Sequence, residues 1–233
     1  MRISYSAIDT YKTCPLKYKY QEIDKIRVPK SREAVFGTAL HHALKFMFSR
    51  DPLYPTLDEV INFYGDEWQR LRDKTVWSDE RVEKLFNEHG IKILTKFYKQ
   101  NQPWNFNVLD LESRFELPLE DKKNNETHTL AGIIDRIDKP DDETYEIVDY
   151  KTGKRLPSQE TLDKNLQLSI YHLGLLNRWP NISGKKVRLT LHYLAHGEKI
   201  STERSLEDLA RTKEKILEVI REIGKRRETQ NDF

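Results

Sequence analysis

The stretch "EIVDYKTGK" at residues 146–154 places Asp149 and Lys151 two positions apart, where an apolar, β-prone segment ends in a turn. Successive side chains of a strand point to opposite faces, so these two lie on one face, about 7 Å apart along the chain. Charged groups are rarely buried unless they are paired or hold a metal ion. The pair is therefore either a solvated strand end or half of an active site.

A second carboxylate, Asp135 in "AGIIDRID", follows small and apolar residues and is expected on another largely buried strand. If the two strands form a hairpin, Asp135 lies beside Asp149. Neighbouring carboxylates raise each other's pKa unless a cation lies between them, and oxygen ligands suit Mg²⁺ or Mn²⁺. A lysine beside such an ion can orient a water molecule or stabilise charge on a phosphate. The pattern indicates metal-assisted phosphodiester hydrolysis, with an inter-strand salt bridge as the alternative that Asp-x-Lys alone favours.

Two further pairs of residues share helical faces. "FGTALHHAL" places Gly37 and His41 four residues apart, so the glycine can allow a close approach and the imidazole can bind a metal. "NLQLSIYHLGLL" places Gln167 and Tyr171 at the same spacing, where an amide and a phenol can reach a site or a nucleic-acid strand. The alternatives are a core or surface histidine and the polar edge of a packed helix.

Periodicity and capping residues predict the elements that position these side chains. Three strands are expected as an antiparallel meander, and two more as a hairpin around His196-Gly197: residues 108–119, 127–138 and 144–151, then 185–195 and 199–205. The expected helices are residues 6–20 (capped by Ser6 and interrupted near Pro15), 32–48, 57–73 (opened by a Thr56 capping box), Ser78–Gln100, Ser158–Leu176 and Ser205–Arg227.

This order of elements predicts one mixed α/β domain over residues 1–233, with a central sheet flanked by helices. Residues 1–104 are its mainly helical N-terminal elaboration, 105–205 the catalytic sheet and helix, and 206–233 the C-terminal helix.

The composition is 37% hydrophobic and 33% charged, with a net charge of +2. No apolar run approaches the roughly 20 residues of a membrane span, and "MRISYSAIDT" lacks the apolar core of a signal peptide, so we expect a cytoplasmic protein without membrane contact. Basic residues alternate with tyrosines near the N-terminus, which suits nucleic acid, although charge alone favours solvated helical faces. The single cysteine, Cys14, excludes an internal disulfide.

Taken in order, the motifs resemble those of the PD-(D/E)XK nuclease superfamily, and within it the RecB-like exonuclease branch. That branch contains the RecB and AddB nuclease domains and the CRISPR-associated adaptation nucleases, and the resemblance implies a restriction-endonuclease-like sheet. The matching pairs and sets are Gly37/His41, Gly132/Asp135/Arg136/Asp138, Asp149/Lys151 and Gln167/Tyr171.

The resemblance also implies residue roles. The metal, Mg²⁺ or Mn²⁺, would be bound by His41, Asp135, Asp149 and the backbone carbonyl of Tyr150, and Lys151 would activate water. Asp135, Asp149 and Lys151 would be the catalytic residues. The expected DNA contacts are Gln167, Tyr171 and Arg136. Glu112 matches a glutamate often found in this branch and is either a supporting residue beside the ligands or simply exposed, whereas Asp138 is expected to pair with a basic neighbour.

The opening "SYSAIDTYKTCPLKYKY" resembles the start of relatives that carry an iron–sulfur cluster, in which Cys14 would be one ligand. Such a cluster needs four ligands and no cysteine trio follows, so no cluster is expected in this chain. Cys14 is then either a vestigial ligand, left after loss of a C-terminal cluster segment, or a small buried helical residue.

The resulting hypothesis is an Mg²⁺- or Mn²⁺-dependent deoxyribonuclease, most simply an exonuclease at single- or double-stranded DNA ends in repair, recombination or CRISPR adaptation. The sequence has no Gly-x-x-x-x-Gly-Lys-Ser/Thr phosphate loop, so unwinding would require a helicase partner. The alternative is a non-catalytic DNA-binding or structural subunit of a helicase–nuclease or adaptation complex.

Overall fold

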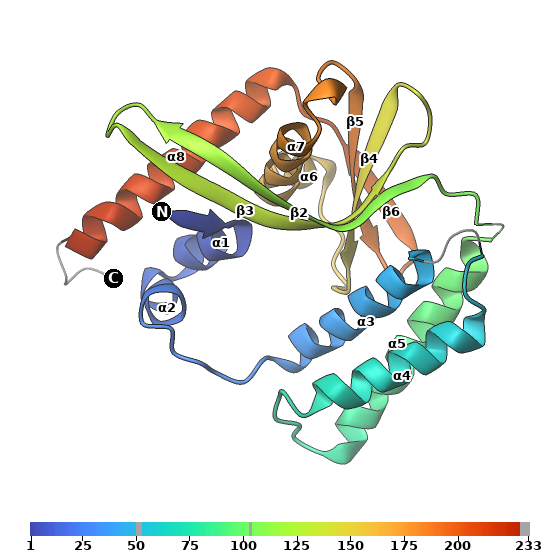
Figure 1. The fold of residues 1–233 in the computed structure, drawn as a ribbon. Helices are drawn as coiled ribbons and strands as arrows, with labels where there is room; N and C mark the ends of the chain where they lie inside the picture. The colour runs from blue at the N-terminus through green and yellow to red at the C-terminus, as the bar shows by residue number, and fades with distance from the viewer. Residues whose placement is uncertain (50–52, 103, 229–233) are drawn as a thin grey trace.

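The computed structural model describes residues 1–49, 53–102 and 104–228 (Figure 1). Its strands are β1 (Arg2–Ser4), β2 (Val108–Asp121), β3 (Glu126–Asp138), β4 (Thr144–Lys151), β5 (Lys186–Tyr193) and β6 (Glu198–Thr202). Its α-helices are α1 (Tyr5–Thr13), α2 (Pro15–Tyr18), α3 (Arg32–Phe48), α4 (Leu57–Arg72), α5 (Glu80–Gln100), α6 (Gln159–Asp163), α7 (Leu166–Arg178) and α8 (Leu206–Glu228). A π-helical turn follows α2 at Lys19–Ile23, and a 3₁₀ turn follows α7 at Pro180–Ile182.

The strands form one mixed six-stranded sheet in the order β1-β3-β4-β5-β6, with β2 also paired to β3, so the predicted α/β class is confirmed. The antiparallel meander β2-β3-β4 and the β5-β6 hairpin are present as predicted. Two parallel pairings were not predicted: β1 with β3, and β4 with β5. The second follows from the crossover through α6 and α7, because parallel neighbours need a long connection.

Helices cover both faces of this sheet and create two apolar clusters. The first contains residues of α1, α7 and α8, and the second is built mainly from α3, α4 and α5 (Figure 1). Strand β4 joins them, because Ile147 packs into the first cluster while Val148 and Tyr150 pack into the second. No helix among the described residues has the length and apolar character needed to cross a membrane.

The helix starts follow capping chemistry, with two corrections to the predicted caps. Thr56 and Glu59 form the expected capping box of α4. The cap of α5 is Asp79 rather than Ser78, because the Asp79 carboxylate accepts from the Arg81 N–H at 2.7 Å. The cap of α1 is Ser4 rather than Ser6, since the preceding residues are held in β1.

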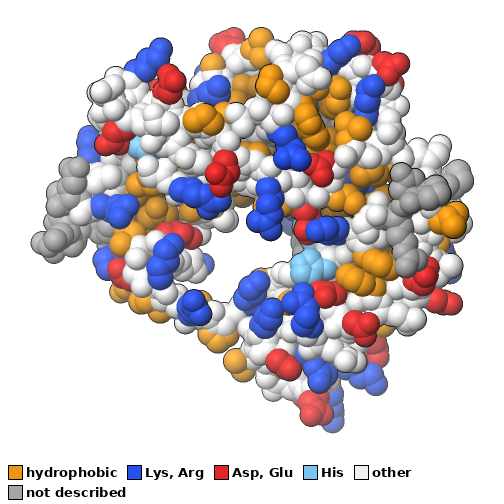
Figure 2. All heavy atoms as spheres, viewed as in Figure 1, with side chains coloured by type: hydrophobic (Ala, Val, Ile, Leu, Met, Phe, Trp, Pro, Cys, Tyr) orange, Lys and Arg blue, Asp and Glu red, His pale blue; other side chains and the backbone are white. Residues whose placement is uncertain are grey.

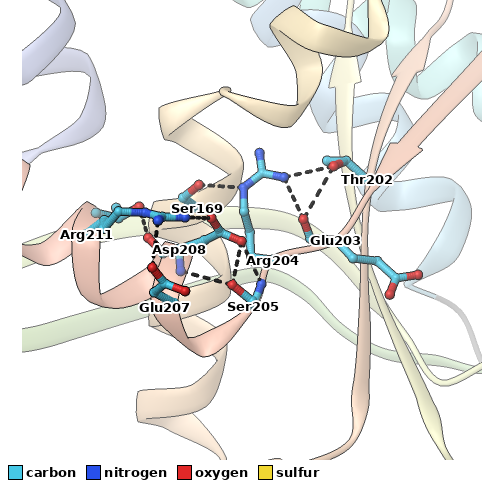
Figure 3. A network of polar contacts seen from close by, with 9 residues as sticks. Ser169, Thr202, Glu203, Arg204, Ser205, Glu207, Asp208 and Arg211 are labelled. Atoms are coloured by element: carbon cyan, nitrogen blue, oxygen red, sulfur yellow. Dashed lines mark hydrogen bonds and ion pairs between the residues drawn. The ribbon is translucent and has the colours of Figure 1, made fainter.

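The helix predicted over Ser158–Leu176 is divided into α6 and α7. Asn165 interrupts it, because its side chain accepts a hydrogen bond from the Leu168 N–H and opens α7. Figure 3 shows the polar network beside this break, at the junction of β6 and α8. There Arg204 donates to Ser169 Oγ and to Thr202 Oγ1, both at 2.8 Å, and to the Leu162 carbonyl at 2.9 Å. The arginine thereby fixes α6 and α7 relative to the last strand.

The Phe115 ring of β2 lies between two glycines. A Cβ atom added at Gly132 or at Gly174 would come within 2.5 Å of this ring, closer than real contacts allow. Strand β3 and helix α7 can therefore approach β2 closely only because both positions lack a side chain.

Gly174→Ala is expected to lower the free energy of unfolding by about 1–3 kcal/mol, because the added methyl group must displace a buried ring. Urea denaturation monitored by circular dichroism measures this change. Gly65→Ala is the matched control, since nothing lies within 4 Å of its Cβ and alanine is the better helix former. Recovery of stability in Gly174→Ala/Phe115→Leu would attribute the loss to the ring, and equal stability of both glycine variants would contradict the prediction.

Candidate active site

One edge of β3 is shared by two other strands, and the candidate site lies between them. Strand β1 pairs with Thr129–Ala131, and the β4 ladder begins at the Arg136–Val148 pair. Asp135 lies one residue before that ladder, and its Oδ2 accepts a hydrogen bond from the Tyr150 N–H at 2.9 Å. A side chain therefore replaces the backbone carbonyl in the ladder, and the strands separate into a fork at Asp135.

Helix α3 carries His41 to this fork. Gly37, one turn earlier, faces Thr152, whose Oγ1 would lie 3.6 Å from an added Cβ atom. His41 Nε2 is 3.1 Å from the Tyr150 carbonyl oxygen, and Nδ1 is 3.4 Å from Asp135 Oδ1. Burial lowers the pKa of His41, but the carboxylates of Asp135 and Asp149 outweigh it, so the pKa lies above its usual value.

Four predicted residues form a continuous polar chain on the other side of the fork. Lys151 Nζ lies 2.6 Å from Asp149 Oδ2 and donates to Gln167 Oε1 at 2.7 Å, and Gln167 Nε2 donates to the Tyr171 hydroxyl at 2.8 Å. Asp149 is only 2% exposed, and burial raises its pKa to about 6 against the opposing charge of Lys151. The lysine is therefore held in one position by a buried carboxylate and an amide.

The groups around the fork suit a hard divalent cation in kind. They offer two carboxylates and the Tyr150 carbonyl oxygen, the oxygen ligands that Mg²⁺ and Mn²⁺ prefer, together with one imidazole nitrogen. Asp149 Oδ2 is buried and makes no hydrogen bond to a described residue, despite its ion pair with Lys151. A recess of about 10 Å³ is lined by His41 and Asp135. This volume is close to the minimum that one water molecule needs.

The donors are not yet gathered around one point. Among the described residues, no three His, Cys, Asp or Glu side chains form a metal-binding group. His41 instead lies between two of the oxygen atoms, and its imidazole contacts both Asp135 and the Tyr150 carbonyl. The types of donor therefore fit the ion. Their arrangement differs from a closed metal site, because the His41 imidazole lies between the Asp135 carboxylate and the Tyr150 carbonyl oxygen.

Glu112 of β2 lies beside the same recess. The pairs on either side of it, Leu111 with Arg136 and Ser113 with Ile134, place it opposite Asp135. Its φ of 48° is in the left-handed region, which costs a non-glycine residue about 1–3 kcal/mol. Its carboxylate is half-buried and pairs with Lys45 at 2.8 Å. Of the two alternatives for Glu112, this placement favours a supporting role beside the ligands.

The position of Arg136 argues against the predicted contact with DNA. Its side chain is 2% exposed, donates to the Tyr150 hydroxyl at 2.9 Å, and pairs with Asp138 Oδ2 at 2.8 Å. Its guanidinium carbon also lies 4.3 Å from the centre of the Phe48 ring. Arg136 therefore joins α3 to the sheet from inside the second cluster, and the expected pairing of Asp138 with a basic neighbour is confirmed.

Two residues of the N-terminal segment bear on the predictions for the site. Cys14, between α1 and α2, is a free, half-exposed thiol rather than a buried helical residue. Tyr5, which opens α1 beside the fork, was missed by the sequence analysis. Burial raises its pKa, with Asp9 and Asp149 adding to the effect. Only the pairing of β1 with β3 brings Tyr5 near Asp149, so no local pattern could have revealed it.

Figure 2 shows an opening in the molecule between the part that contains α1 and α2 and the part that contains α3, α4 and α5. Lysine and arginine side chains surround this opening, and a histidine lies at its edge. The connection between the two parts is held to the turn after α4, because the Lys30 N–H donates to the Lys74 carbonyl at 3.2 Å. Positive charge around such an opening suits a phosphate backbone.

His192, on β5 behind the site, is expected to make stability depend on pH. Its ring is 3% exposed and packs against Phe97 and Tyr150. Burial lowers its pKa to about 3. The folded state therefore binds this proton less readily than the unfolded chain does. The free energy of unfolding should be highest above about pH 6.5 and should decrease as the pH is lowered toward 3.

Within that pH range, His192 should lower the free energy of unfolding by at most about 1.4 kcal/mol per pH unit. Urea unfolding at pH 7.5, 6.5 and 5.5 measures it, and His192→Phe should flatten the dependence relative to the parent protein. An unchanged slope in His192→Phe would show that the imidazole is not the responsible group.

The sequence model of the PD-(D/E)XK nuclease superfamily matches residues 2–232. The structure of a protein from Eubacterium rectale, described as a "Putative exonuclease", is similar with a TM-score of 0.57 and 8% identity, over 96% of this chain and 81% of that one. SSO0001 gives a TM-score of 0.41 at 15% identity, over 81% of this chain and 84% of that one. No curated protein matches the sequence. Because the family match spans nearly the whole chain, the protein belongs to the PD-(D/E)XK nuclease superfamily.

Proposed function

We propose that this protein is an Mg²⁺- or Mn²⁺-dependent deoxyribonuclease of the RecB-like branch that cleaves phosphodiester bonds at DNA ends. The observation that carries the proposal is the placement of Asp135, Asp149 and Lys151 beside the fork between β3 and β4, with Gln167 holding the lysine. Membership of a superfamily of nucleases supports it, as does the similarity in fold to a protein described as an exonuclease.

His41, Asp135, Asp149 and the Tyr150 carbonyl would hold the divalent ion. When bound, such an ion stabilises negative charge on the phosphate and makes a water molecule more acidic. In the overall hydrolysis, the oxygen of a water molecule would form a bond to phosphorus as the bond to the departing nucleoside oxygen breaks. One proton of the water would be released and the departing oxygen would take up a proton, which yields one phosphate monoester and one hydroxyl.

The contribution of the chain itself is to position a charge. Lys151 Nζ can donate a hydrogen bond to the attacking water or to a non-bridging phosphate oxygen, which stabilises the charge that develops there. Gln167 and Asp149 fix this ammonium group from two sides, and Tyr171 fixes the amide of Gln167. A group fixed in advance needs no reorganisation during the reaction.

A second candidate function is a non-catalytic DNA-binding subunit of a helicase–nuclease or adaptation complex. One observation favours it, namely that the candidate ligands are not gathered around one point among the described residues. Both functions share the basic opening of Figure 2, and they differ in whether the bound strand is cleaved.

The test follows end-labelled linear and circular DNA, single- and double-stranded, with Mg²⁺, Mn²⁺ or EDTA. Metal-dependent loss of linear DNA alone is expected. Degradation of circles as well would replace the exonuclease by an endonuclease. A folded protein that binds DNA without cleaving it in any metal would favour the non-catalytic subunit.

A further inference from the structure

A groove of about 500 Å³ lies beside the active site, between α3, α5 and the loop that follows β4. Its walls are largely apolar and aromatic, with one charged group of each sign. The residues that matter most are Glu33, Phe36, Leu85, Phe86, His89 and Lys154. None of them takes part in the hydrolysis proposed above.

The aromatic groups of this groove are arranged for stacking. The rings of Phe36 and His89 are nearly parallel, with an interplanar angle of 14° and centroids 5.7 Å apart, and Phe86 meets Phe36 edge to face. Phe36 is buried, whereas His89 is exposed and Leu85 is 63% exposed. The groove therefore presents a solvated apolar surface supported from below by a fixed ring.

One cation, Lys154, lies on the side of the groove nearest the catalytic strand, together with the neutral imidazole of His89. Burial lowers the pKa of His89, and Lys154 and Lys92 lower it further, so the imidazole is neutral at pH 7. Lys154 follows the catalytic Lys151 by three residues and is exposed. Glu33 gives the groove one negative charge, which keeps a phosphate backbone on the side of the lysine.

The groove is continuous with the active site along α3. Thr152, which lines the groove, contacts Gly37, and His41 lies one turn further along the same helix. Phe36 precedes His41 by five residues, which corresponds to about 7.5 Å along the helix axis. Phosphates along one strand of stacked DNA are about 3.4 Å apart and are further apart when the strand is unstacked, so this separation is at most about two nucleotides.

We propose that this groove binds a base of the substrate strand within about two nucleotides of the cleaved bond, with Leu85, Phe86 and His89 contacting the base and Lys154 the adjacent phosphate. The inference rests on the proposed function. It adds that the enzyme takes an unpaired strand, because a base can enter the groove only when it is free of its partner and its neighbours. Aromatic stacking of this kind tolerates every base, so the subsite holds the strand without selecting a sequence.

The test measures binding of short single-stranded oligonucleotides in EDTA, where cleavage is prevented, by fluorescence anisotropy. The double variant Leu85→Ala/His89→Ala is expected to bind about tenfold more weakly than the parent protein, the usual loss for one stacked base. The matched control is Leu206→Ala, which removes another highly exposed leucine (74%), from α8. It should bind as the parent does.

A series of oligonucleotides with a single abasic position separates a base contact from a backbone contact. The expected result is one position, within about two nucleotides of the cleaved bond, at which removing the base weakens oligonucleotide binding by the parent protein. Removing the same base should leave binding by the double variant unchanged. Equal loss at every abasic position would place the contact on the backbone and overturn the inference.

Cleavage by the parent protein, measured in parallel with Mg²⁺ or Mn²⁺, separates this inference from the proposed function. If the parent cleaves linear DNA and the double variant binds as tightly as the parent, the base subsite is overturned and the groove fits another occupant, such as a protein side chain. If the parent neither binds nor cleaves DNA, the proposed function and the subsite both fail.

Discussion

Lys151→Ala is expected to reduce the rate of DNA cleavage by about 10²–10³-fold, the usual effect of removing one fixed donor from a site of developing charge. Asp149→Asn should reduce it at least as much, because it would remove a proposed metal-ligand oxygen and one of the two groups that hold Lys151. Single-turnover cleavage of end-labelled DNA at saturating Mn²⁺ measures both rates. Lys164→Ala and Asp142→Asn, which change exposed charges of the same kinds, should cleave as the parent protein does.

The stability of Asp149→Asn separates loss of chemistry from loss of structure. Burial raises the pKa of Asp149 to about 6, so at pH 7.5 the folded protein contains an ionised carboxylate in an unfavourable environment. Replacing it with a neutral amide should leave the melting temperature in EDTA unchanged or higher. A variant that loses both cleavage and stability would show that Asp149 supports the fold instead of the reaction.

Arg136→Met is expected to have the largest effect on stability, a loss of about 3–5 kcal/mol, because Asp138 would remain buried without its partner. The arginine also donates to the Tyr150 hydroxyl and packs against Phe48, so its removal weakens the attachment of α3 to the sheet. Urea denaturation measures the change. DNA cleavage by the fraction that stays folded should be nearly normal, since the guanidinium has no access to the fork.

A second substitution tests the reason for that loss. In Arg136→Met/Asp138→Leu no charge is left unpaired, so most of the stability should return. Arg2→Ala is the control for an exposed pair, because Arg2 and Glu116 are 69% and 64% exposed and such pairs contribute at most about 1 kcal/mol. A loss for Arg136→Met no larger than that of Arg2→Ala would contradict the prediction.

The polar chain of the candidate site was predictable because each of its parts is local. A hairpin of consecutive strands brings Asp135 beside Asp149, and helical spacing places Gln167 on the same face as Tyr171. The register of such short-range pairings follows from the alternation of apolar residues, which the sequence displays directly.

The remainder of the site depends on pairings between distant parts of the chain. Strand β1 has three residues and no pattern of its own, so neither its partner nor the position of Tyr5 was predictable. Arg136 was assigned to DNA because it belongs to a motif, but the motif does not reveal which face of the pleat it occupies. The break at Asn165 was missed because the apolar period continues across it, and only the capping hydrogen bond shows that the helix restarts.

The pairing of β1 with β3 has a consequence for synthesis on the ribosome. The α-amino group of Met1 lies 3.0 Å from His128 Nδ1, although 127 positions separate them. At about 5–20 residues per second, roughly 6–25 s of translation pass before the first strand meets its partner. Meanwhile the α3, α4 and α5 bundle can collapse as it emerges, whereas the apolar face of α1 has nothing to cover it. The nascent chain therefore exposes this face for seconds, and during this time the uncovered apolar surface is prone to association with other chains.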